Sequence, residues 1–119
     1  MHEVAIAQEI IEIVKSYLPN EDNVYVKSVK IDLGDFSNIL PEALKFSFDV
    51  LLTDTELKGA KLEITKIPLK IKCSDCGHIA ILDEPFFFCP DCSSPNVEIL
   101  SGTELKVVEI ELKEINNIN

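Results

Sequence analysis

Four cysteines constrain this chain more than any other feature. They form two Cys-x-x-Cys pairs, Cys73 with Cys76 and Cys89 with Cys92, and 12 residues separate the pairs. Each such turn directs two thiolates at one metal ion, and two turns complete a tetrahedron. The spacing predicts a structural zinc site with no open position for catalysis. Iron and a redox dithiol are the alternatives, although a thioredoxin-type redox pair needs only one such motif.

The residues around the cysteines shape this prediction. The segment is too short to bury much of a core, so metal binding must supply its folding energy. Gly77 suits the left-handed turn that follows a cysteine pair, whereas Ser93 at the equivalent place predicts either local strain or a turn that closes differently. His78 is an alternative zinc ligand, and the other interpretation is an exposed loop histidine. The run Phe86–Phe88 is expected to pack the zinc unit, with a partner surface as the alternative.

Composition excludes several classes of function. The chain has 119 residues, 46% of them apolar, and a formal charge of −10 with no Arg or Trp. This disfavours binding to nucleic acid or to an anionic membrane, because both need Lys and Arg to neutralise phosphates. No apolar run approaches the roughly 20 residues that span a bilayer, and no secretory signal is visible. We therefore expect a cytoplasmic protein.

Hydrophobic spacing predicts a small α/β domain. Apolar residues recur every three or four positions between Val4 and Leu18, and again after Pro41, which indicates two amphipathic helices. Alternating segments from Ser28, from Lys61 and after Gly102 indicate three strands. A strand–helix–strand crossover favours parallel pairing of the first two strands, and the last is expected to return antiparallel. The predicted fold is α/β, with two helices on one face of a small three-stranded mixed sheet.

The cysteine unit is predicted to be an insertion in that sheet. The strand pattern changes phase around Pro68, which a period-2 element cannot do without a bulge or a break. We interpret this as the exit into a zinc-ribbon-like unit between the second and third strands. The expected domains are 1–67 with 103–119, and 68–102.

The amino terminus offers a second set of metal ligands. The Met1 α-amine, deprotonated backbone amides and the His2 imidazole can close fused chelate rings round one ion. Such an all-nitrogen square-planar set suits Ni(II) or Cu(II). Glu3 could add its amide nitrogen or its carboxylate. The same residues are also compatible with an ordinary chain start that has Glu3 in the first turn of the helix.

Several stretches together resemble the hydrogenase nickel-insertion metallochaperones of the HypA/HybF family. The similarity runs from Met1 to Leu112. The chain departs from the family pattern at Asp54 and Ser93, where the family commonly has glycine. The stretches that carry the resemblance are Met1-His2-Glu3-Val4, Lys30 to Phe36, Pro41 to Phe46, Gly59 to Ile64, both cysteine pairs, and Ser101 to Leu105.

The resemblance implies a two-part protein that is not an enzyme. It implies nickel ligation at Met1, His2 and Glu3, with zinc ligation at Cys73, Cys76, Cys89 and Cys92. Family members deliver Ni(II) to the hydrogenase large-subunit precursor, usually alongside a nickel-handling GTPase, and in some organisms to urease. The first domain is then the nickel-binding part and the second the zinc-binding part, in a monomer or homodimer. The rival hypothesis is a zinc-ribbon adaptor that binds protein and has no nickel function.

Overall fold

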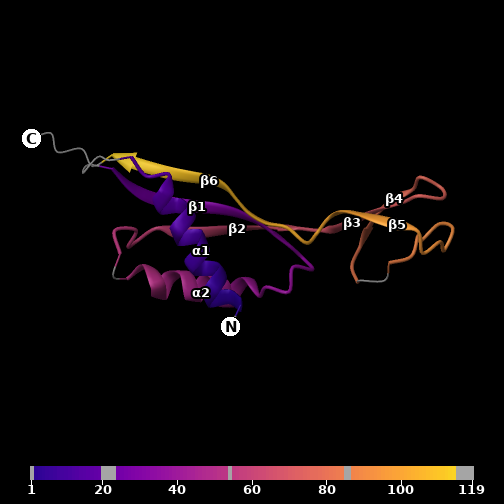
Figure 1. Cartoon of the computed structure of the whole chain (residues 1–119), viewed down its shortest axis with the longest axis horizontal. Coiled ribbons are helices and arrows are strands. Elements are labelled where there is room, and N and C mark those ends of the chain that lie inside the picture. The colour runs from indigo at the N-terminus through magenta and orange to yellow at the C-terminus, as the bar shows by residue number, and fades with distance from the viewer. Residues whose placement is uncertain (1, 20–23, 54, 85–86, 115–119) are drawn as a thin grey trace, which may run out of the picture. The chain divides into compact units, whose positions relative to one another are not determined.

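The computed structural model describes residues 2–19, 24–53, 55–84 and 87–114. These residues form two helices and six strands (Figure 1). The element order is α1 (His2–Ser16), β1 (Val24–Gly34), α2 (Pro41–Leu52), β2 (Lys61–Ile67), β3 (Leu69–Cys73), β4 (Ile79–Leu82), β5 (Val97–Ser101) and β6 (Leu105–Glu114).

The predicted order of elements is confirmed, and the cysteine segment proves to contain strands of its own. The strands form two three-stranded sheets, one ordered β2-β1-β6 and the other β4-β3-β5. Pro68 lies between β2 and β3, and these two consecutive strands belong to different sheets. The phase change around Pro68 therefore coincides with the passage of the chain from one sheet to the other.

The sheet β2-β1-β6 is mixed, as predicted. The Gly34 N–H at the end of β1 donates to the Glu104 carbonyl just before β6, at 2.8 Å. Near the start of β1, Lys27 Nζ lies 3.7 Å from Glu111 Oε2, well along β6. Moving backward along β1 therefore corresponds to moving forward along β6, so the two strands are antiparallel.

Strands β1 and β2 run parallel. The Asp35 N–H, immediately after β1, donates to the carbonyl of Ile67, the last residue of β2, at 2.8 Å. Two strands whose carboxyl ends meet side by side run in the same direction. A helix joins them along the chain, which is the usual connection between parallel strands.

The chain divides into two compact units. The first unit comprises residues 1–31, 39–64 and 107–119, and the second unit comprises 32–38 and 65–106. In the first unit α1 and α2 contact each other beside the sheet (Figure 1). Its buried apolar side chains are Ala7, Ile10, Ile11, Val14, Val26, Val29, Ile31, Leu44, Phe48, Leu52, Leu57, Ala60 and Leu62. The assignment of nickel and zinc binding to separate domains stays a prediction.

The second unit has a much smaller core. Its buried apolar side chains are Leu33, Leu69, Ile71, Cys73 and Cys89. Antiparallel pairing of β3 with β4 and with β5 leaves Ile79 and Ile81 exposed on the face that also carries Lys70 and Lys72. A unit that buries so few side chains is stabilised little by the hydrophobic effect alone.

Two glycines let backbone segments of the second unit cross at close range. Gly102 has φ +115°, and a Cβ there would lie 2.5 Å from the Leu69 Cα. A Cβ on Gly34 would lie 2.2 Å from the carbonyl carbon of Gly102. The Gly102 carbonyl accepts a hydrogen bond from the Phe36 N–H at 2.8 Å. No side chain larger than hydrogen fits at this crossing.

The substitution Gly102→Ala is therefore expected to destabilise the second unit by at least about 3 kcal/mol, because backbone strain adds to a clash with backbone atoms. Gly59→Ala is the matched control. Gly59 also has a positive φ, +92°, but nothing lies within 4 Å of a Cβ there, so only about 1–2 kcal/mol of strain is expected. Urea unfolding followed by circular dichroism measures both. An equal loss of unfolding free energy in the two variants would contradict the close backbone approach at Gly102.

Candidate metal centre

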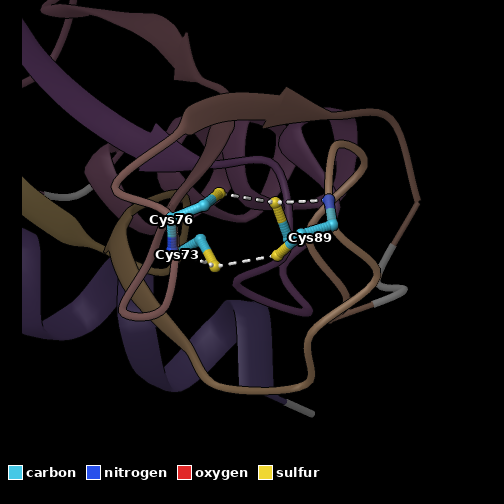
Figure 2. A group of neighbouring side chains, drawn as sticks. Cys73, Cys76 and Cys89 are labelled. Atoms are coloured by element: carbon cyan, nitrogen blue, oxygen red, sulfur yellow. Dashed lines mark hydrogen bonds between the residues drawn. The ribbon is translucent and has the colours of Figure 1, made fainter.

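The four predicted cysteines converge in the second unit. Their sulfur atoms all lie within 4.8 Å of one another, and all four thiols are free. The Sγ atoms of Cys73 and Cys92 are 3.6 Å apart, and those of Cys76 and Cys89 are 3.5 Å apart. Figure 2 shows the sulfurs of Cys73, Cys76 and Cys89 turned toward one another. These separations far exceed a disulfide bond, which is about 2.05 Å long.

The spacing of the sulfurs suits one tetrahedral metal ion. Zinc bonded to four thiolates at about 2.3 Å requires sulfur–sulfur separations of about 3.8 Å. The Cys76–Cys89 and Cys73–Cys92 separations, 3.5 and 3.6 Å, come close to this value. The site could therefore hold a metal such as zinc, with all four positions of the tetrahedron taken by protein.

Both cysteine turns point backbone N–H groups at sulfur. The Cys76 N–H lies 3.4 Å from Cys73 Sγ, and the Cys92 N–H lies 3.5 Å from Cys89 Sγ. The Asp91 N–H also approaches Cys89 Sγ, at 3.4 Å. Such donors stabilise thiolate charge, as we expect for turns that hold a metal.

The two turns close in the same way. The Gly77 N–H donates to the Cys73 carbonyl at 2.9 Å, and the Ser93 N–H donates to the Cys89 carbonyl at 2.8 Å. Gly77 has φ +78° and Ser93 has φ +64°. The left-handed position predicted at Gly77 is confirmed, and Ser93 adopts it in spite of its Cβ.

Polar residues join the two halves of the cluster. Asp75, inside the first turn, accepts hydrogen bonds from Ser94 Oγ and, at 3.2 Å, from Asn96 Nδ2. The Ser94 hydroxyl, followed by the Asn96 amide, holds the pKa of Asp75 below its ordinary value. The Ser74 N–H donates to the Asn96 carbonyl at 2.8 Å. The residues after the second turn thus hold the first turn in place.

His78, which follows the first cysteine turn, contacts the second turn. Its Nδ1 lies 3.3 Å from Oδ2 of Asp91, which belongs to the second turn. The group of metal-ligating side chains found among the described residues contains the four cysteines without His78. The imidazole therefore faces a carboxylate of the opposite turn and is not brought into the ligand cluster.

Proximity alters the acidity of the metal-free thiols. The Cys76 N–H is the main group that lowers the pKa of Cys73 to about 7. The His78 N–H lowers the pKa of Cys76, but the Cys89 side chain and desolvation outweigh it and raise that pKa to about 12. The pKa of Cys92 is raised because Cys73 and desolvation outweigh the Ser94 N–H. Without a metal, Cys73 therefore ionises more readily than Cys76 and Cys92.

The phenylalanine run does not form the core of this unit. Phe86 lies outside the described residues, and Phe87 and Phe88 are 40% and 55% exposed. The expectation that these rings pack the zinc unit is therefore wrong for Phe87 and Phe88. The side chains buried there instead come from Leu33, from β3 and from Cys89.

Of the proposed nickel ligands, Glu3 and the backbone of His2 lie within the described residues. Met1 and the side chain of His2 are outside the described part of the chain. Helix α1 begins at His2, two residues before the Val4 start of the predicted pattern, and it places Glu3 in the first turn. One Glu3 carboxylate oxygen accepts a hydrogen bond from the Leu40 N–H at 3.2 Å. Sequence reasoning missed this contact, because 37 residues separate the partners.

Fold and site together define a class of protein: a small α/β protein with a four-cysteine metal site in a compact unit of its own. Residues 1–112 match the family described as HypA, hydrogenase/urease nickel incorporation, metallochaperone. The chain therefore belongs to the HypA family, whose members are metallochaperones and maturation factors.

Relatives of known name cover nearly the whole chain. The hydrogenase maturation factor HypA of Desulfosudis oleivorans is 42% identical over 115 residues, which is 96% of this chain and 100% of that protein. The HypA of Trichodesmium erythraeum is 41% identical over 116 residues, covering 98% and 99%. The solution structure of the Ni metallochaperone HypA from Helicobacter pylori matches with a TM-score of 0.64 and 21% identity, over 92% of this chain and 95% of that one. This last likeness concerns the fold.

None of the helices in the described residues is long and apolar enough to cross a lipid bilayer.

The substitution Ser93→Gly is expected to stabilise the second unit by up to about 1 kcal/mol, because glycine adopts a positive φ without strain. Gly77→Ala is the reciprocal variant. It places a Cβ on the equivalent residue of the first turn, where nothing lies within 4 Å, and should destabilise the unit by a similar amount. Zinc retention against a chelator, measured with thermal unfolding, should move in opposite directions in the two variants. A shift in the same direction would contradict the shared turn geometry.

Zinc uptake by the metal-free protein is expected to release protons, because the metal binds thiolates. Near pH 7 a Cys73 thiol with a pKa of about 7 is half ionised, whereas a Cys76 thiol with a pKa of about 12 is protonated. Lowering the pH protonates Cys73 as well, so the zinc affinity should fall as the pH decreases through 7. Calorimetric titration in buffers of different ionisation enthalpy counts the protons. A pH-independent affinity without proton release would exclude thiolate ligation.

Proposed function

We propose that this protein binds Ni(II) at its amino terminus and delivers the ion during maturation of [NiFe]-hydrogenase. Membership of a family of nickel-incorporation metallochaperones supports this proposal. The observation that carries it furthest in this chain is the position of α1, which begins at His2 and contains Glu3. The first four N–H groups of a helix have no partner within that helix. Nickel binding by the backbone nitrogens of His2 and Glu3 would therefore break no hydrogen bond of the helical ladder.

The proposed nickel site uses four nitrogens. They are the Met1 amine, the backbone nitrogens of His2 and Glu3, and the His2 imidazole. Both amides lose their protons on binding, and the partial positive charge at a helix N-terminus favours the resulting anions. Nickel(II) accepts such a square-planar nitrogen set, whereas zinc prefers a tetrahedron.

We propose a structural role for the resident metal of the second unit. The donor set, four cysteine sulfurs within 4.8 Å of one another, fits zinc. Cys73, Cys76, Cys89 and Cys92 would hold the ion, and the ion would supply the folding energy that the small core lacks. A closed tetrahedron offers no position to a substrate, which supports a role in delivery and not in catalysis.

The partners follow from the proposed delivery. Nickel goes to the hydrogenase large-subunit precursor, with urease as a further recipient in some organisms, and GTP hydrolysis belongs to a nickel-handling partner. The cytoplasmic location expected from the sequence stays a prediction. A zinc-ribbon adaptor without nickel function is the outcome to test against, since it would carry zinc and take up no nickel.

The test compares two changes at the amino terminus with one at the other histidine. His2→Ala removes one of four ligands and should weaken nickel binding more than the roughly 10–100-fold that loss of an outer-sphere partner costs. One Gly added before Met1 should do nearly as much harm, because it moves the amine and turns the Met1 nitrogen into an amide. His78→Ala is the control and should leave nickel affinity unchanged, because its imidazole faces Asp91.

Nickel affinity is measured by titration of protein with a native amino terminus, beside circular dichroism and zinc content. All three variants should keep the native spectrum and their zinc. If the Gly-extended protein binds nickel as tightly as the native one, the terminal amine is not a ligand. If the native protein binds zinc alone, the adaptor hypothesis is favoured.

A further inference from the structure

The hydrogen bond between Glu3 and Leu40 joins the first turn of α1 to the start of α2. Glu3 Oε2 accepts from the Leu40 N–H at 3.2 Å, and both residues belong to the first unit. Leu40 is the N-cap residue of α2, in extended conformation with φ −81° and ψ 120°. Its carbonyl accepts the first hydrogen bond of that helix, from the Leu44 N–H at 2.9 Å.

We propose that the Glu3 carboxylate is a positioning group that anchors the nickel-binding chain end to α2, and is not itself a nickel ligand. This inference rests on the proposed function, because it concerns the same amino-terminal site. It also decides between the two contributions that the sequence leaves open for Glu3, its carboxylate and its amide nitrogen.

The anchor and the chelate do not compete for the same atoms. The fused chelate rings run from the Met1 amine through the His2 nitrogen and close at the Glu3 nitrogen. Every backbone torsion inside those rings precedes the Glu3 Cα, so the carboxylate can remain on Leu40 while the amide nitrogen binds nickel. A carboxylate that ligated the metal would instead have to leave the Leu40 N–H.

Anchoring favours nickel binding because it limits the motion of one ligand nitrogen before the ion arrives. A chain end must lose conformational freedom when it wraps a metal, and a residue that is already fixed loses less. The hydrogen bond is charge-assisted, and the carboxylate lies at the start of α2, where the helix dipole favours negative charge. The N–H of residue 40 thus supports a ligand 37 residues earlier in the chain.

Proline at position 40 removes this donor selectively. A φ of −81° lies within the range that proline adopts, and the Leu40 carbonyl, which caps α2, is retained. Leu40→Ala is the matched control, because it loses the same side chain, which is 64% exposed, but keeps the N–H. At the other end of the bond, Glu3→Ala removes the acceptor, whereas Glu3→Gln keeps an acceptor oxygen and loses the charge.

Nickel(II) is the probe, titrated into full-length protein with its zinc bound and a native amino terminus. Leu40→Pro and Glu3→Ala should each weaken nickel binding about tenfold, the factor that one charge-assisted hydrogen bond supplies. Leu40→Ala and Glu3→Gln should stay within about threefold of the native protein. The double variant Leu40→Pro with Glu3→Ala should bind nickel no more weakly than Glu3→Ala alone, because Glu3→Ala already removes the bond that Leu40→Pro breaks.

A second measurement separates positioning from ligation. The absorption spectrum of bound nickel should be the same in the native protein, Leu40→Pro and Glu3→Ala, because all four nitrogens are retained. A changed spectrum in Glu3→Ala and Glu3→Gln alike would make the carboxylate a ligand and overturn the inference. So would equal nickel affinity in Leu40→Pro and Leu40→Ala, or tighter binding in Leu40→Pro.

Circular dichroism and zinc content must match the native protein in each variant, and Glu3→Ala against Glu3→Gln keeps the test intact if Leu40→Pro does not fold. Failure of the proposed function has a different signature. In that case the native protein itself binds no nickel, or binds it without regard to the terminal amine.

Discussion

Repulsion between four closely spaced thiolates is the constraint on which the second unit depends. Their sulfurs lie within 4.8 Å of one another, a spacing that like charges tolerate only around a cation. In the metal-free cluster the Cys76 N–H lowers the pKa of Cys73 to about 7, whereas the Cys89 side chain and desolvation raise the pKa of Cys76 to about 12. The surrounding residues stabilise charge on the sulfurs and connect the two cysteine turns. Backbone N–H groups face sulfur in both turns. Ser94 donates to Asp75, and His78 contacts Asp91. With so few buried side chains, this unit would depend on such an ion for its stability.

The features that sequence predicts here are those with a local period or a fixed spacing. Short stretches of sequence are enough to predict the cysteine pairs, the helix after Pro41 and the break at Pro68. The early part of β1 could not be predicted in this way. Val26 and Ser28 are buried in one phase, and the buried positions then shift to Val29 and onward, so no single alternation covers the strand. The predicted strand accordingly starts at Ser28, whereas β1 starts at Val24.

Contacts between distant residues could not be predicted for a different reason. Asp75 meets Ser94 and Asn96, and Glu3 meets Leu40, only because the fold brings their segments together. An aspartate inside a Cys-x-x-Cys turn, or a glutamate in a first helical turn, is equally consistent with a solvated side chain. An aspartate inside the first cysteine turn, together with Ser and Asn after the second cysteine pair, is a weak signal for the contact of Asp75 with Ser94 and Asn96. Nothing in the sequence marks the contact of Glu3 with Leu40.

The two proposed metal sites differ in what release of the ion costs the fold. Zinc would be bound by residues on which a small core depends, so its loss would loosen the whole unit. Nickel would be bound by the first residues of α1, whose N–H groups lie outside the helical hydrogen-bond ladder. Loading and unloading there leave the buried face of α1, from Ala7 to Val14, in place. A cargo ion can thus leave a folded protein, and a retained structural ion keeps that protein folded throughout.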